Sequence, residues 1–174
     1  MKNSLLAVSC ATLSLFCAPA FAEALTEKSI QAFIDKSTSL SHQNNGMTDD
    51  QITDFLDDHV ARGAVFTSQI MYDIPGQPAQ MRQLVLNKSD FIKQTIEGRN
   101  TMQDYTSSVI LKKTDINGDQ ANIVIETTDS GRAPMNGTAV NFEGKSSCNQ
   151  VLKEDGGTIV VMSAACETII SFKE

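Results

Sequence analysis

The C-terminal stretch from Thr138 to Phe172 constrains the fold more than any other part of the chain, because it combines alternating apolar residues with two cysteines. The alternation runs on both sides of the segment 153–157, whose sequence KEDGG is a turn signal. Such a pattern is typical of a long β-hairpin with one buried face. The even positions that carry it are Val140, Phe142, Cys148, Leu152, Val160, Met162, Ala164, Cys166, Ile170 and Phe172.

The two cysteines provide an independent test of this hairpin. A disulfide requires them to face each other, and that register places Phe142 opposite Phe172 and Leu152 opposite Met162. The cross-strand bond and the single apolar face therefore demand the same register. We predict a Cys148–Cys166 disulfide, and the alternative is a pair of buried free thiols.

The first 22 residues have the features of a secretory signal peptide. Lys2 precedes a short apolar run, and Ala20 and Ala22 supply a small-x-small ending. The alternative is an uncleaved membrane anchor, but the run is too short to cross ~30 Å of hydrocarbon. We predict cleavage after Ala22, which assigns residues 1–22 to a cleaved signal peptide and 23–174 to a single domain.

The charge and the cysteine content of the mature chain limit its partners and its compartment. Removing residues 1–22 leaves 13 basic and 21 acidic residues, a net charge of −8, which is unfavourable for binding nucleic acid or an anionic membrane surface. No later stretch is apolar for the ~20 residues that a membrane span needs. A disulfide in an exported chain indicates an oxidising compartment. We predict the periplasm, with the extracellular medium as second choice.

Upstream of the hairpin, the periodicity predicts helices first and strands later. Ile30, Phe33 and Ile34 recur at helical spacing, and Thr48 opens a capping box ahead of a second apolar stripe. Two prolines and a glycine in 74–78 predict a loop between two strands. The expected elements are helices at 24–40 and 48–60, strands at 64–73 and 80–86, a helix opened by Asn87 and ended by Gly98, and strands at 105–116 and 120–128 before the C-terminal hairpin.

The dipeptide Asn117-Gly118 is the strongest local hairpin signal in the chain. Pairing about it places Ile110 opposite Ile125 and Leu111 opposite Val124. Residues 129–137 contain two glycines and a proline and are predicted to form a loop. Helices that cover one face of an antiparallel sheet make an α+β domain.

This order of elements resembles the nuclear-transport-factor-2-like (SnoaL-like) superfamily. The resemblance rests on segments 55–60 (FLDDHV), 87–92 (NKSDFI) and 116–121 (INGDQA), and it covers nearly all of the mature chain. It implies a cone-shaped α+β fold, with a curved antiparallel sheet wrapped around about three helices and a pocket at the open end. Members include isomerases, cyclases and dehydratases as well as binding and accessory domains, and many dimerise through the sheet.

His59 is the most conspicuous candidate for chemistry, because it lies on the apolar stripe of the second helix beside two aspartates. An imidazole with an ordinary pKa of ~6.5 could act as an acid or base with a carboxylate such as Asp58 or Asp73. Asp73 comes close to the position of the aspartate that directly precedes a proline in isomerases of the superfamily, with Ile74 intervening before Pro75. The alternative is a half-buried histidine bonded to the backbone.

Other chemistries find no support in the sequence. The two histidines, His42 and His59, are far apart, so a zinc site is not expected. Segment 115–126 matches a calcium loop only in part, because its glycine is misplaced and strands flank it. Nucleophile-elbow, P-loop and dinucleotide motifs are absent from the sequence. We expect neither a cofactor nor a metal.

Whether the cone is hollow decides what the protein can bind. If it is, the candidate ligand-binding residues are Phe55, His59, Tyr72, Phe142 and Met162, and their apolar character suits a small apolar or amphipathic ligand. The alternative is that these side chains fill the cone. We predict a periplasmic ligand-binding or assembly domain without clear catalytic residues, which forms a homodimer through the sheet. The alternative is a cofactor-independent isomerase, lyase or hydrolase that uses His59.

Overall fold

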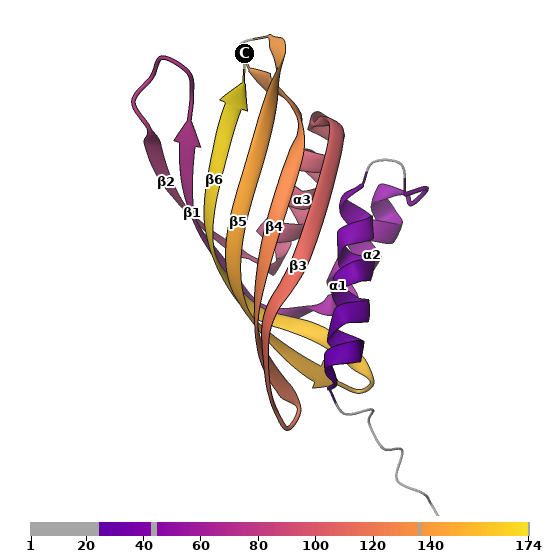
Figure 1. Cartoon of the computed structure of the whole chain (residues 1–174). Helices are drawn as coiled ribbons and strands as arrows, with labels where there is room; N and C mark the ends of the chain where they lie inside the picture. Colours follow the sequence, from indigo (N-terminus) through magenta and orange to yellow (C-terminus); the bar gives the residue numbers. More distant parts are fainter. Residues whose placement is uncertain (1–24, 43–44, 136, 174) are drawn as a thin grey trace, which may run out of the picture.

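The computed structural model describes residues 25–42, 45–135 and 137–173 and shows three helices against one face of a six-stranded sheet (Figure 1). The predicted signal peptide lies outside the described residues. The elements are α1 (Glu27–Ser41), α2 (Asp49–His59), β1 (Val60–Asp73), β2 (Gln80–Asn87), α3 (Lys88–Thr101), β3 (Gln103–Asn117), β4 (Gln120–Met135), β5 (Thr138–Asp155) and β6 (Thr158–Lys173).

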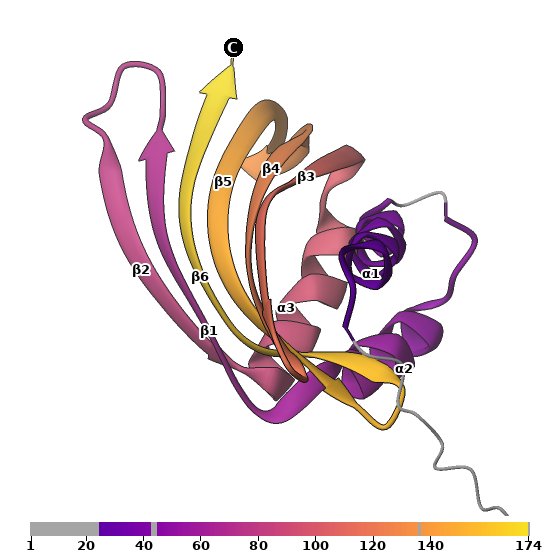
Figure 2. The same cartoon turned by 60° about the horizontal axis from the view of Figure 1, so that its bottom comes forward.

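The strands lie in the order β2-β1-β6-β5-β4-β3. Neighbouring strands are antiparallel except for β1 and β6, the first and the last strand, which pair in parallel. The sheet curves strongly around the helices without closing on itself (Figure 2). This arrangement confirms the predicted α+β cone.

The starts of α2 and α3 follow the predicted caps, and two predicted helix ends are wrong. Thr48 and Asn87 cap α2 and α3 through their side chains, as the sequence indicates. The second helix ends at His59, because Val60 is already extended and opens β1 without a loop. Gly98 does not end α3, since its carbonyl accepts the N–H of Met102 and the helix continues to Thr101.

The C-terminal hairpin confirms the predicted disulfide and most of the predicted register. Cys148 and Cys166 are bonded and face each other, and Phe142 faces Phe172. The predicted pairing of Leu152 with Met162 is wrong, because β6 carries one extra residue and Leu152 faces Val161. Such a bulge bends a strand, and here it turns Leu152 and Val161 into the core together.

The second hairpin also forms at the predicted place but with another register. Its two turn residues are Gly118 and Asp119 rather than Asn117 and Gly118. Gly118 has a φ of 64°, as a glycine at the first central position of a type II′ turn requires. The predicted pairings of Ile110 with Ile125 and of Leu111 with Val124 are therefore wrong. A further irregularity near position 112 leaves Ile110 opposite Glu126 and Leu111 opposite Ile125.

The predicted loop at 129–137 is mostly strand, which is the largest error in the predicted fold. Strand β4 continues to Met135 and pairs with β5 along that whole length. Its pairing with β3 ends at Arg132, so Pro134 lies in an edge segment of β4 that pairs with β5 alone, and an edge tolerates the missing N–H of a proline. The extension brings Asp129 into line with the other side chains of the concave face.

The core has two parts, one between α1 and the sheet and one among the helices. The first contains Leu25, Ile30, Ile34, Ala121, Ile123, Ile125, Cys148, Leu152 and Val161. The second contains Leu40, Ile52 and Phe55. No residue of α3 is fully buried, although Phe91 stacks on Phe66 of β1 and Ile96 packs against the core among the helices. No helix in the described part of the chain is both long and apolar enough to cross a membrane.

Candidate functional site

A cavity of about 470 Å³ lies between the concave face of the sheet and the three helices, so the cone is hollow. Its lining comes from every helix and from all strands except β2. Much of the lining is apolar, and the disulfide forms part of the wall contributed by β5 and β6. Its polar lining residues include His59, Arg99, Tyr105, Ser107, Thr127, Asp129 and Ser146.

Aromatic rings from four different elements form the apolar part of the cavity. The ring of Phe66 on β1 stacks on that of Phe91 on α3, with centroids 4.0 Å apart and planes nearly parallel. Phe33 on α1 and Phe55 on α2 supply two more rings. The stacking of Phe91 on Phe66 holds α3 in position over the cavity, which α3 covers with partly exposed side chains.

His59 lines the cavity but its ring is held by the protein itself. Its Nδ1 lies 2.7 Å from the carbonyl oxygen of Ile159, so Nδ1–H donates a hydrogen bond to the backbone of β6. Its ring also contacts those of Phe55 and Phe33, at centroid distances of 4.1 and 5.4 Å. These contacts tie the end of α2 to β6 and leave only Nε2 available to a ligand.

The structure does not bring the predicted carboxylates to His59. Asp58 is exposed on α2, and Asp73 is exposed at the far end of β1, roughly 45 Å away along the strand at about 3.3 Å per residue. No acidic side chain of the described part of the chain forms an ion pair or hydrogen bond with His59. Within the same ranges, no group of three or more His, Cys, Asp or Glu is placed to hold a metal.

The other predicted ligand-binding residues lie in different places. Phe55 lines the cavity together with His59. Tyr72 and Met162 are half-buried residues outside the lining. Phe142 is buried behind it, where its ring lies 6.5 Å from that of Tyr105.

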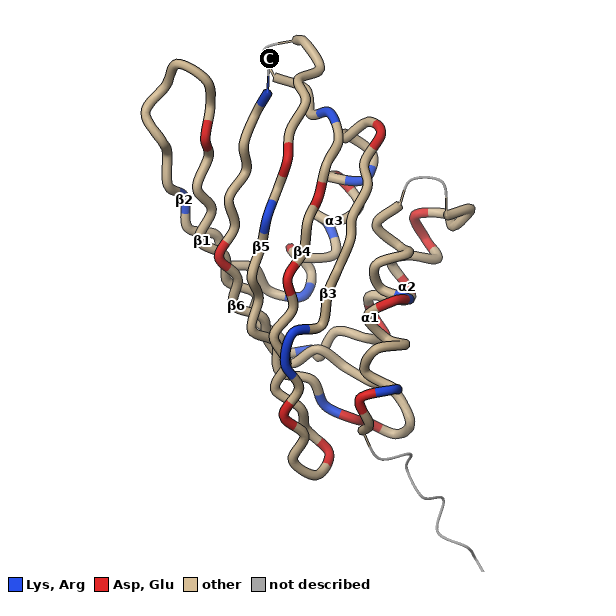
Figure 3. The backbone as a smooth tube through the Cα atoms, in the orientation of Figure 1, with Lys and Arg blue, Asp and Glu red and all other residues tan. Residues whose placement is uncertain are grey.

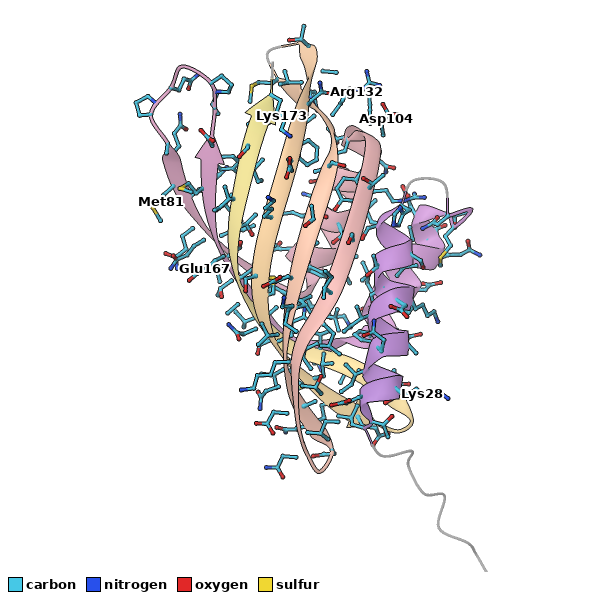
Figure 4. All side chains as sticks on the ribbon, in the orientation of Figure 1. Lys28, Met81, Asp104, Arg132, Glu167 and Lys173 are labelled. Atoms are coloured by element: carbon cyan, nitrogen blue, oxygen red, sulfur yellow. A yellow bond between two sulfur atoms is a disulfide. The ribbon has the colours of Figure 1, made fainter. Side chains whose placement is uncertain are left out.

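A hydrogen-bonded tyrosine and aspartate form the most distinctive polar feature of the cavity. The hydroxyl of Tyr105 on β3 donates to Oδ1 of Asp129 on β4 over 2.8 Å. Burial raises the pKa of Tyr105 well above its ordinary value near 10, and the carboxylate of Asp129 raises it further. The phenol therefore stays protonated and keeps the carboxylate oriented. Figure 4 labels Asp104 and Arg132, which pair at the end of β3 and β4 next to this site.

Sequence reasoning missed this pair because it assigned Asp129 to a loop. One signal could have found it, since the alternation of Ala121, Ile123 and Ile125 continues in step through Thr127 to Asp129. The odd positions of β3 run in the same way from Tyr105 through Ser107. Both series point to the concave face.

The convex face of the sheet carries exposed apolar side chains among charged ones. The most exposed large apolar side chains on its strands are those of Val65, Met81, Val85, Ile110 and Ile169. Figure 4 labels Met81 on β2 and Glu167 on β6, and Figure 3 shows acidic and basic positions interspersed along the sheet. The homodimer through the sheet stays a prediction.

Comparison with solved structures identifies the fold. A candidate scytalone dehydratase from Novosphingobium aromaticivorans superimposes with a TM-score of 0.56 at 10% identity, over 84% of this chain and 87% of that one. A protein from Kribbella flavida superimposes with a TM-score of 0.54 at 9% identity, over 81% of this chain and 88% of that one. A conserved protein from Planctomyces limnophilus superimposes with a TM-score of 0.53 at 10% identity, over 82% of this chain and 98% of that one.

These similarities confirm the predicted nuclear-transport-factor-2-like fold. No protein-family model matches the sequence, and no curated protein matches it either. At such low identity the similarity establishes the fold alone. Because one fold hosts many functions, the function must be argued from the cavity.

Proposed function

We propose that this protein is an exported domain that binds one small amphipathic molecule in the cavity of its cone. The observation that carries the proposal is the space of about 470 Å³ between the helices and the concave face. Ligand sites of small molecules measure ~300–1,000 Å³ and combine apolar walls with a few fixed polar groups. This cavity has both, with phenylalanine rings from four elements and the Tyr105–Asp129 pair.

The arrangement of the polar groups favours binding over catalysis by His59. General acid–base chemistry needs a proton-transfer group within hydrogen-bond reach of the substrate, and the proposed reaction paired His59 with a nearby carboxylate. The Nδ1 of His59 is occupied by the carbonyl of Ile159, and its predicted carboxylate partners are exposed elsewhere. The histidine therefore acts as a wall of the cavity and as a link between α2 and β6.

Binding is tested with the neutral, apolar dye N-phenyl-1-naphthylamine and the chain 23–174. We expect saturable fluorescence enhancement with one dye molecule per chain, because the apolar lining excludes water from the dye. The same protein unfolded in denaturant serves as the control and should give no saturable signal. A native protein that gives none either would disprove the proposal.

Export is tested by expressing the whole chain in a Gram-negative host. We expect the protein in the periplasmic fraction with Glu23 as its first residue, because the small-x-small ending at Ala20 and Ala22 directs cleavage there. A chain that starts with a methionine directly before Glu23 is the matched control and should stay in the cytoplasm. Recovery of the uncleaved chain from the cytoplasm would rule out this part of the proposal.

A further inference from the structure

The concave face changes from apolar to polar along its strands. One row across the sheet places Leu111, Ile125 and the disulfide side by side. Two rows further along, Ser107 lies opposite Asp129, next to the hydroxyl of Tyr105. A molecule that lies along the strands would therefore meet apolar walls at one end and a carboxylate at the other.

Asp129 is a half-buried carboxylate with one oxygen available. Its Oδ1 accepts the hydrogen bond of Tyr105, and Oδ2 has no hydrogen-bond or ion-pair partner in the described part of the chain. Both residues of this pair are only partly buried, and both line the cavity. The free oxygen is thus positioned to accept a hydrogen bond from a bound molecule.

Among the described residues, no Lys or Arg forms an ion pair with Asp129. Arg99 also lines the cavity, but its guanidinium pairs with Asp49 at 2.9 Å and donates to the carbonyl of Met47. Arg132, three residues along β4, pairs with Asp104 instead. A carboxylate in a partly apolar space gains most from a partner that is both a hydrogen-bond donor and positively charged.

We propose that the cavity selects ligands whose polar end is a protonated amine, which binds Oδ2 of Asp129, and whose apolar body lies against the phenylalanine rings. Tyr105 acts as the positioning residue, because its hydrogen bond fixes the carboxylate. Ligands that end in a carboxylate are disfavoured, because two like charges would share a site of low polarity. This inference rests on the proposed ligand-binding function and names the chemical class of its ligand.

The test compares three ligands with one apolar body in competition with N-phenyl-1-naphthylamine: 1-naphthylmethylamine, 1-naphthylmethanol and 1-naphthoic acid. At pH 7 and low salt we expect the amine to bind at least about tenfold more tightly than the acid, with the alcohol between them, because hydrogen bonds to charged groups are the stronger class. This ranking is measured on the unaltered chain 23–174 and needs no variant to fold.

Two variants that each remove one negative charge test whether the selectivity comes from Asp129. Asp129→Asn should reduce the ratio of amine to acid affinity by about tenfold, because it removes the charge but keeps the shape. Asp115→Asn removes an exposed carboxylate of β3 and should leave the ratio unchanged. Tyr105→Phe should lower the ratio by less than Asp129→Asn does, since it loosens the carboxylate without removing it.

The possible failures are distinguishable. If the dye does not bind the unaltered protein, the proposed function fails and this inference falls with it. If the dye binds but the amine and the acid compete equally, only the inference is overturned. It is also overturned if Asp129→Asn and Asp115→Asn change the ratio by the same amount, because long-range charge would then explain the selectivity.

Discussion

Reduction of the Cys148–Cys166 disulfide is expected to lower the free energy of unfolding by about 3 kcal/mol, which corresponds to a fall of about 6–12 °C in Tm. The bond closes a loop between residues 18 apart in sequence, and breaking it returns conformational entropy to the unfolded chain. Cys148 also belongs to the buried cluster beneath α1. Thermal unfolding of the chain 23–174 with and without a reductant measures the effect.

The control for this experiment is the double variant Cys148→Ser, Cys166→Ser. It should already unfold at the lower temperature, and the reductant should not change its Tm. This comparison separates the loss of the bond from other effects of the reductant. Equal Tm values for the unaltered chain in both conditions would show that the disulfide contributes no stability.

The substitution Ala164→Phe is expected to weaken dye binding by at least about tenfold while costing less than about 1 kcal/mol of stability. Ala164 lines the cavity on β6, between Phe66 of β1 and Gln150 of β5. In a filled core, a benzyl group in place of a methyl would be overpacked and would cost ~1–3 kcal/mol. In a hollow cone, the ring occupies the space that the ligand needs. Dye titration and chemical denaturation of the same samples measure both effects.

The neighbouring residue gives a matched control. Ala165→Phe adds the same ring to the exposed convex face of β6, so dye binding should stay within about threefold of the unaltered value. Ser146→Phe on β5 is a second cavity variant, in case Ala164→Phe does not fold. A folded cavity variant that binds the dye as well as the unaltered chain would contradict the position of the site.

Local signals in the sequence predicted the elements well and their exact pairing less well. Thr48 and Asn87 act within their own helix turn, so the caps could be predicted from neighbours in sequence. The register near Met162 could not be predicted in this way, because the bulge there belongs to the curvature of the whole sheet. The curvature of a sheet is the sum of contacts among strands that are distant in sequence, and no local window contains them.

The candidate site, too, could be predicted where it depends on one helix and could not where it depends on the pairing of strands. Phe55 and His59 could be predicted as cavity residues because they share the apolar stripe of one helix. The partnership of Tyr105 and Asp129 depends on the length and register of two long strands, and glycines and a proline near Asp129 suggested a loop instead. Gly131 and Pro134 lie inside β4, and Pro134 is tolerated there because the pairing with β3 ends at Arg132.

The sequence by itself determined which side chains share a face of each strand and helix, because the spacing of such side chains is set by backbone geometry alone. The disulfide and the class of fold followed from those faces. The tertiary structure decided that the cone contains a cavity and that Asp129, which has no ion-pair partner in the described part of the chain, lies at its polar end. The physical reason is that apolar periodicity shows which side chains turn inward. The volume left between them depends on how far the curved sheet and α3 stand apart.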